Sequence, residues 1–209
     1  MDPTAQASTD DIAYVRQLAE SAARAPLVGG RFMAWWGFLV TIAWTAQHFA
    51  NNGTIGDGET IYGIIWIAFG VAGGLGQFLL ARTMPERAGT GSAGNRAMRA
   101  AWFAAAASIG AMVVGVIFAS RDLGPALFDW IVPLAFAVYA LAQIVTGVLA
   151  GNRILTTAGY GAVVMVGISA AFVLYSDRYL LAAAGAALTV MLPGLLLLRA
   201  EPGVQSEAS

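Results

Sequence analysis

Six long apolar stretches constrain this chain more than any other feature. Each is 19 to 23 residues long and, apart from Asp129, contains no Asp, Glu, Arg or Lys. A helix needs about 20 apolar residues to cross the hydrocarbon core of a bilayer. The sequence therefore predicts an all-α membrane protein with six transmembrane helices in a bundle. The predicted helices cover residues 32–50, 61–81, 100–120, 128–150, 154–175 and 180–198.

Composition agrees with this class of protein. Apolar residues make up 58% of the chain and charged residues 11%, whereas a soluble domain has about 25% charged residues. The residues outside the six stretches are too few for a separate soluble domain. We therefore expect a transmembrane domain at 31–199, between a cytoplasmic segment at 1–30 and a cytoplasmic tail at 200–209.

The distribution of arginine predicts the orientation. Every basic residue is an arginine, and most arginines lie before the first stretch, in the second and fourth connections, or after the last stretch. Basic loops stay in the cytoplasm, so both termini are expected there. The alanine-rich, lysine-free composition suggests a bacterium with a GC-rich genome, which would place the protein in the inner (plasma) membrane.

The first thirty residues predict a short amphipathic helix. Ile12, Val15 and Leu18 fall on one face, while Arg16 and Glu20 fall elsewhere. Such a helix could lie on the membrane surface, dock a partner, or pack on its own bundle.

The stretch AGTGSAG at 88–94 contains the G-x-G-x-x-G spacing of dinucleotide-binding loops. That spacing has meaning only between a strand and a helix, with an acidic residue about 20 positions later. Here it lies between two apolar stretches. We therefore expect a flexible linker and no nucleotide; the net charge of −1 gives no indication of nucleic acid either.

Small and polar residues on shared helix faces predict where helices pack. Small side chains let helix backbones approach closely, and a glutamine on that face can hydrogen-bond across the contact. The predicted packing interface consists of Gly70, Gly73, Gly74 and Gln77 in the second stretch and Ala104, Ser108 and Gly115 in the third.

A second group of residues is the alternative candidate for lining a ligand or solute path. The group contains Thr41, Trp44, His48, Tyr139 and Gln143. Polar groups inside a membrane span are costly and therefore informative. Gln143, like Gln77, could equally serve a helix contact. The single histidine, His48, is more typical of a hydrogen-bonding or interfacial residue than of a haem ligand.

The three helical hairpins could be repeats of one ancestral unit. Ala68-Phe69-Gly70-Val71 leads to Gln77 in the second stretch, and Ala135-Phe136-Ala137-Val138 leads to Gln143 in the fourth. Interfacial aromatic residues recur in any membrane protein, however, so chance similarity is the alternative.

We expect neither an enzyme nor a metal or cofactor site. The chain has no cysteine and one histidine, and no Asp, Glu, Arg or Lys lies in the middle third of any stretch. The leading hypothesis is a membrane protein that acts by helix–helix interaction, as a homo-oligomer or as an accessory or regulatory subunit of another membrane protein, in contact with lipid. The alternatives are an uncoupled transporter or channel for a small neutral or lipophilic solute, and a membrane sensor that binds lipid, quinone or pigment.

Overall fold

The computed structural model describes residues 27–56, 59–83 and 91–201, and this part of the chain contains no β-strand. It forms six helices, as predicted from the apolar stretches. The first five are α2 (Gly30–Asn51), α3 (Glu59–Arg82), α4 (Ala93–Leu123), α5 (Ile131–Leu149) and α6 (Arg153–Ala171). The sixth is continuous and consists of α7 (Arg178–Ala186), the π-helical turn η2 (Ala187–Met191) and α8 (Leu192–Ala200). A 3₁₀ turn, η1 (Pro125–Trp130), precedes α5.

Five of the six helices are long and apolar enough to cross a membrane. The helix that does not meet this criterion is α2, which has a comparable length of 22 residues. Its second half carries Gln47 and His48, whose polar side chains lower the hydropathy. The predicted amphipathic helix falls largely on residues 1–26 and the predicted tail on 202–209, outside the described residues.

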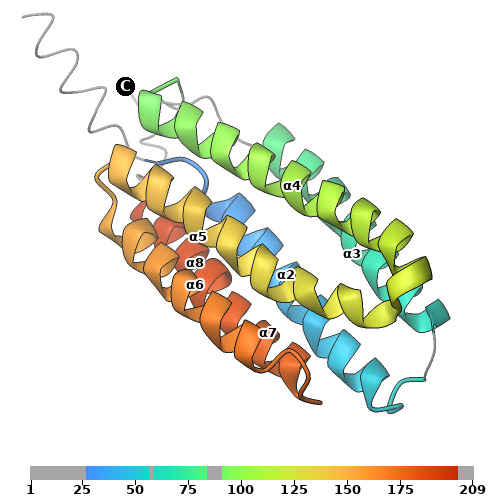
Figure 1. The fold of residues 1–209 in the computed structure, drawn as a ribbon. Coiled ribbons are helices and arrows are strands. Elements are labelled where there is room, and N and C mark those ends of the chain that lie inside the picture. Colours follow the sequence, from blue (N-terminus) through green and yellow to red (C-terminus); the bar gives the residue numbers. More distant parts are fainter. Residues whose placement is uncertain (1–26, 57–58, 84–90, 202–209) are drawn as a thin grey trace, which may run out of the picture.

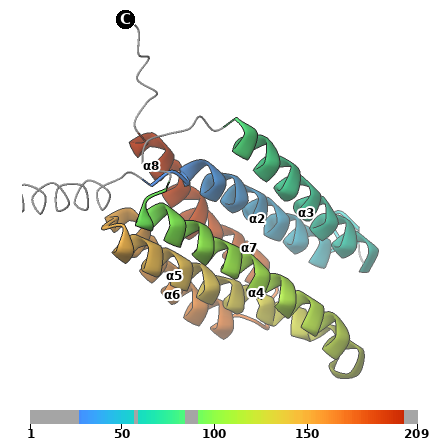
Figure 2. The ribbon, with the colours of Figure 1, turned by 90° about the horizontal axis from the view of Figure 1, so that it is seen from above.

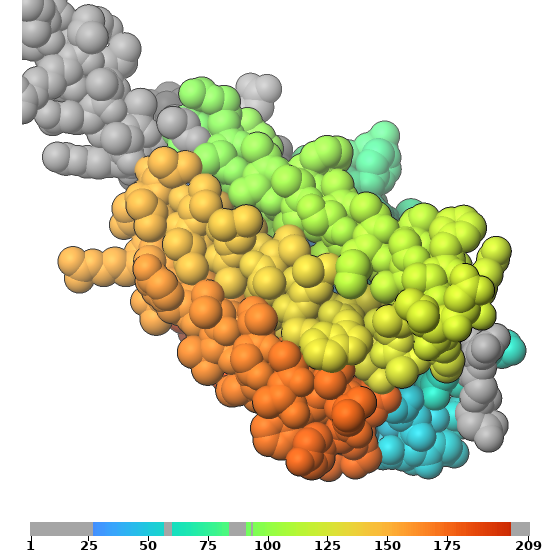
Figure 3. Space-filling view, in the orientation of Figure 1, coloured from blue at the N-terminus to red at the C-terminus, as the bar shows by residue number. Residues whose placement is uncertain are grey.

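The helices form one curved row in which each packs on the next (Figures 1 and 2). The order along the row is α3, α2, the α7–η2–α8 helix, α6, α5 and α4. The two end members therefore differ from the rest: α3 packs mainly on α2, and α4 packs on α5 and η1. Figure 3 shows α4, α5 and α6 side by side across one face of the molecule.

Both ends of the described chain meet at the same end of the bundle. The Gly30 amide donates to Glu201 Oε1 (3.2 Å), and the Val28 amide donates to Asn95 Oδ1 (2.9 Å). The start of α2, the end of α8 and the start of α4 are thereby joined. We call this the Arg-rich end, because the helix termini there carry Arg31, Arg82, Arg96, Arg99, Arg153 and Arg199.

Glycine brings α2 and the sixth helix into backbone contact. A Cβ atom on Gly37 would lie 2.5 Å from the Met191 amide nitrogen, and one on Gly194 would lie 2.3 Å from the Ala34 nitrogen. The π turn ends at Met191, two positions before Pro193, which lacks the amide hydrogen needed for a regular α-helical bond. The local unwinding therefore falls where α2 packs most closely on this helix.

The helix ends differ from the predicted span limits in two places. α4 begins at Ala93 rather than near residue 100, because Ser92 caps it by accepting a hydrogen bond from the Asn95 amide (3.3 Å). Gly94, assigned by sequence to a linker, is therefore helical, and its Cβ position is 3.2 Å from Ala150 Cβ. The predicted fifth span ends at Tyr175, whereas α6 ends at Ala171 and a turn follows.

Candidate functional site

The predicted glycine face of α3 divides into a packed part and an open part. Gly73 is buried against the ring of Trp36, where an added Cβ would lie 2.2 Å from the ring. Gly70 and Gly74 are exposed and have no atom of another described residue within 4 Å of a Cβ position. Gly76, which the sequence did not single out, packs against Trp35 instead. Within the described chain, the α2 contact thus uses Gly73 and Gly76.

Gln77 takes part in a pair of reciprocal hydrogen bonds between α2 and α3. Trp36 Nε1 on α2 donates to Gln77 Oε1 on α3 (3.0 Å), and Trp66 Nε1 on α3 donates to Gln47 Oε1 on α2 (3.0 Å). The tryptophan and glutamine of each helix are 11 residues apart. Two antiparallel helices with equal spacing bring both pairs into register.

Phe69 fills the space between these two hydrogen bonds. Its ring centroid is 5.5 Å from that of Trp36 and 5.4 Å from that of Trp66, both edge-on. Edge-to-face ring pairs stabilise a contact beyond the area they bury. Together with the two Trp–Gln bonds, which are worth about 0.6 to 2 kcal/mol each in a bilayer, Phe69 fixes the α2–α3 hairpin.

The small residues of α4 lie away from its neighbours. Ala104, Ser108 and Gly115 are exposed, whereas Met98, Ala105 and Val116 on another face are buried. α4 therefore packs on its neighbours through Met98, Ala105 and Val116, and not through the small residues that the sequence suggested. Both faces of this helix are apolar, so periodicity alone does not tell which of them meets protein.

The residues considered for a ligand path do not converge on one cavity. The Thr41 hydroxyl donates to the Gly37 carbonyl of its own helix (2.7 Å). Trp44 packs on Phe136, with 5.5 Å between the ring centroids, in the core between α2, α5 and α7. Tyr139 packs edge-on on the same Phe136 (6.3 Å between centroids) and on Trp102 of α4 (5.9 Å), so aromatic rings fill this part of the interior.

Gln143 is the most unusual of these residues. It is fully buried, and neither atom of its amide has a hydrogen-bond partner among the described residues. The Trp102 indole nitrogen is likewise buried without a partner in that part of the chain. Trp102 and Gln143 are 41 positions apart, which is also the separation of the bonded pair Trp36 and Gln77.

The hairpin register places Trp102 and Gln143 at about the same level. The Gly94 Cβ position contacts Ala150 across α4 and α5, and Trp102 lies eight residues after Gly94 while Gln143 lies seven residues before Ala150. The α4–α5 hairpin therefore repeats the Trp–Gln arrangement of the α2–α3 hairpin without its hydrogen bond. Gly73 lies four positions before Gln77, and Tyr139 lies four positions before Gln143. The α4–α5 hairpin thus has a tyrosine, whose ring packs on Trp102, where the α2–α3 hairpin has a glycine.

His48 belongs to a polar cluster at the end of the bundle opposite the Arg-rich end. Its Nε2 lies 3.0 Å from Asn52 Nδ2, and its Nδ1 is 3.9 Å from Asp177 Oδ1. At the same end of the bundle, Asp129 Oδ1 accepts hydrogen bonds from Arg178 Nε (2.8 Å) and from the Tyr179 hydroxyl (2.6 Å). Asp129 thus joins η1 to α7, and His48 of α2 lies beside the residue that precedes α7.

The described residues contain no group of three or more His, Cys, Asp or Glu side chains that could hold a metal ion. Sequence reasoning missed Trp36, Trp66 and Gln47 as hydrogen-bond partners, although the equal 11-residue spacing was present. It also missed Gly30 and Gly194 as close-packing positions. A search of protein-family models, curated proteins and solved structures found no match to this chain.

Proposed function

We propose that this protein acts by helix–helix association in the membrane, as a homo-oligomer or as an accessory or regulatory subunit of another membrane protein. The observation that carries this proposal is the exposure of α3. Only 6% of the residues in its apolar stretch are buried inside the chain, against 50% for α5 and 50% for the α7–η2–α8 helix. The other end helix, α4, is 11% buried.

We take α3, the less buried of the two end helices, as the candidate for a contact with a second protein, although Gly110 and Gly115 of α4 are open as well. Lipid already surrounds apolar side chains, so packing in a bilayer depends on close backbone approach. Gly70 and Gly74, one turn apart, leave the backbone of α3 accessible on a face that α2 does not cover. Gly63 lies seven residues before Gly70, on the same face, and is equally open.

The scattering of polar side chains supports association over transport. Gln47 and Gln77 are used in the α2–α3 contact, and Thr41 bonds within its own helix. A solute path would instead need polar groups facing one continuous cavity.

A second candidate function, a sensor or uncoupled carrier for a small neutral ligand, is favoured by one observation. Gln143 and Trp102 place polar atoms in the interior without a partner among the described residues, and a small bound molecule would supply that partner. Native mass spectrometry of the purified protein tests this function. A small molecule that leaves on replacement of Gln143 by Met would support it.

We further propose that α2 is a sixth span and that the Arg-rich end faces the cytoplasm of a bacterial cell, which puts both termini inside. The chain lacks cysteine, so single cysteines can be introduced at exposed Gly91 and at exposed Thr54, at opposite ends of the bundle. An impermeant thiol reagent applied to intact cells should label Thr54→Cys only. Labelling of Gly91→Cys alone would show that the protein has the opposite orientation.

The association proposal is tested by leucine substitutions on two flanks of α3. Gly70→Leu and Gly74→Leu should dissociate the assembly while the protomer stays folded, because no described residue occupies their Cβ positions. Ala68→Leu is the matched control, since Ala68 is exposed on the other flank. Size-exclusion chromatography with light scattering in one mild detergent gives the mass of each complex. Equal masses for all three variants and the parent protein would contradict the proposal.

A further inference from the structure

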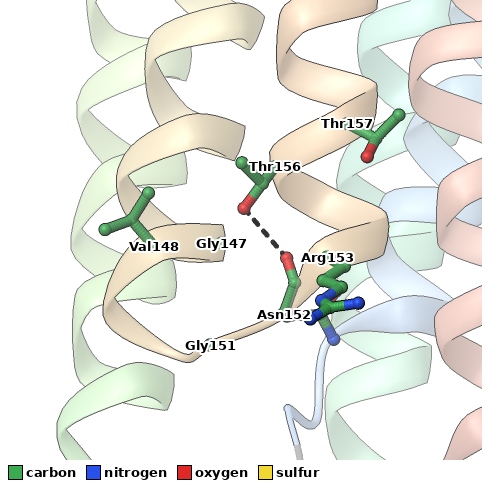
Figure 4. A pocket seen from close by; sticks show the side chains of 7 residues that line it. All are labelled: Gly147, Val148, Gly151, Asn152, Arg153, Thr156 and Thr157. Atoms are coloured by element: carbon green, nitrogen blue, oxygen red, sulfur yellow. Dashed lines mark hydrogen bonds between the residues drawn. The ribbon is translucent and has the colours of Figure 1, made fainter.

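Two shallow hollows meet on the surface of α5. The first has a volume of about 360 Å³, lies at the turn between α5 and α6, and is lined by Gly147, Val148, Gly151, Asn152, Arg153 and Thr157 among others (Figure 4). The second, of about 330 Å³, is lined by Ile144, Val145, Val148 and Leu149. Val148 borders both, so the hollow at the turn, which carries Asn152, Arg153 and Thr157, continues into an apolar groove.

The hollow at the turn has a preformed shape. Gly151 adopts a positive φ of 62°, which lets the chain turn sharply between the helices. Asn152 caps α6 by accepting from the Leu155 amide (3.0 Å), and the Thr156 hydroxyl donates to the Asn152 carbonyl (3.0 Å; Figure 4). A turn held in this way loses little further freedom when it binds a ligand.

The charge of the hollow favours an anion. Arg153 is exposed, and no hydrogen bond or ion pair joins its guanidinium to another described residue. It is one of six arginines at the Arg-rich end, where Glu201 is the only acidic side chain among the described residues. Glu201 is engaged with Gly30 and Arg31, so no described carboxylate competes for Arg153.

The groove argues for a lipid rather than a free anion. Val145, Val148 and Leu149 are 40%, 64% and 63% exposed, and they run from the hollow along α5 toward the middle of the bundle. A hydrated phosphate ion gains nothing from such a surface, whereas an acyl chain packs on it. Basic pockets beside membrane helices are known to recognise anionic head groups.

We propose that the α5–α6 turn binds one anionic phospholipid. The phosphate group lies in the hollow against Arg153, within reach of the Thr157 hydroxyl, and one acyl chain follows the groove past Val148. This site is independent of the α3 face on which the proposed association rests.

The test measures lipid binding to the delipidated full chain in a neutral detergent by native mass spectrometry. Dioleoyl-phosphatidylglycerol should bind in preference to dioleoyl-phosphatidylcholine. Arg153→Gln should weaken the binding of phosphatidylglycerol about fivefold, the factor expected for one arginine near a lipid surface. Arg121→Gln is the control, because Arg121 is exposed at the opposite end, and it should leave this binding unchanged.

A second variant separates the lipid from a free anion. Val148→Trp fills the groove without entering the core, because Val148 is largely exposed, and should also weaken the binding of phosphatidylglycerol. If Val148→Trp has no effect and inorganic phosphate competes fully, the site binds phosphate only and the proposal fails. It fails equally if Arg153→Gln matches Arg121→Gln, or if both lipids bind alike.

Discussion

Replacement of Gly194 by alanine is expected to destabilise the protein by about 2 to 3 kcal/mol, at the upper end of the usual range for overpacking. The added methyl group would lie 2.3 Å from the nitrogen and 2.8 Å from the Cα atom of Ala34. Both are backbone atoms, so no side-chain rotation relieves the clash. α8 must then move away from α2 along a contact in which the two backbones touch.

Gly110→Ala is the matched control for this prediction. Gly110 is also helical, but no described atom lies within 4 Å of its Cβ position. Alanine there should be neutral or stabilising by up to about 1 kcal/mol, because it favours helix over glycine. Thermal unfolding of both variants in the same detergent gives the comparison. Equal melting temperatures would mean that α2 and α8 are not in backbone contact.

Gln143→Met is expected to stabilise the protein by about 1 to 3 kcal/mol, the cost of a buried polar group left without a partner. Methionine has a similar volume and no polar amide, so the packing around Tyr139 and Trp102 is preserved. Gln77→Met, by contrast, removes a hydrogen bond to Trp36 and should cost about 1 kcal/mol.

We therefore expect the two glutamine variants to change the stability in opposite directions. Thermal unfolding of both variants in the same detergent measures these changes. If Gln143→Met destabilises the protein as Gln77→Met does, then Gln143 has a partner. The Trp102 indole is the nearest candidate by register. The double variant of Trp102→Phe and Gln143→Met would then show non-additive losses.

The helices were predictable because long apolar stretches have few other structures available to them in a bilayer. Their ends were less predictable. Arg96 and Arg99 suggested a loop, yet both lie in α4, because a helix can continue beyond the membrane once Ser92 caps it. Hydropathy identifies the part of a helix that meets lipid, whereas caps determine where the helix ends.

The faces of the helices could not be assigned from the sequence. Gly70 and Gly73 differ by less than one turn, but only Gly73 meets Trp36. In a soluble protein the polar side of a helix marks the solvent face, and here lipid and core are both apolar. The Trp–Gln pairs needed the hairpin register as well as the spacing, because each bond joins residues 19 or 41 positions apart.

The most direct test of the proposed association is site-specific photocrosslinking from α3 in intact membranes. A photoreactive phenylalanine analogue at Ile67, a large exposed residue three positions before Gly70 and seven before Gly74, leaves the glycines in place. It should yield a protein adduct of one defined mass, which identifies the partner as a second copy or as another membrane protein. The same analogue at Ala68, exposed on the other flank of α3, should react with lipid alone. If Ile67 also yields only lipid adducts, or if both positions give the same adducts, the open glycine face of α3 is a lipid-facing surface and the proposed function is wrong.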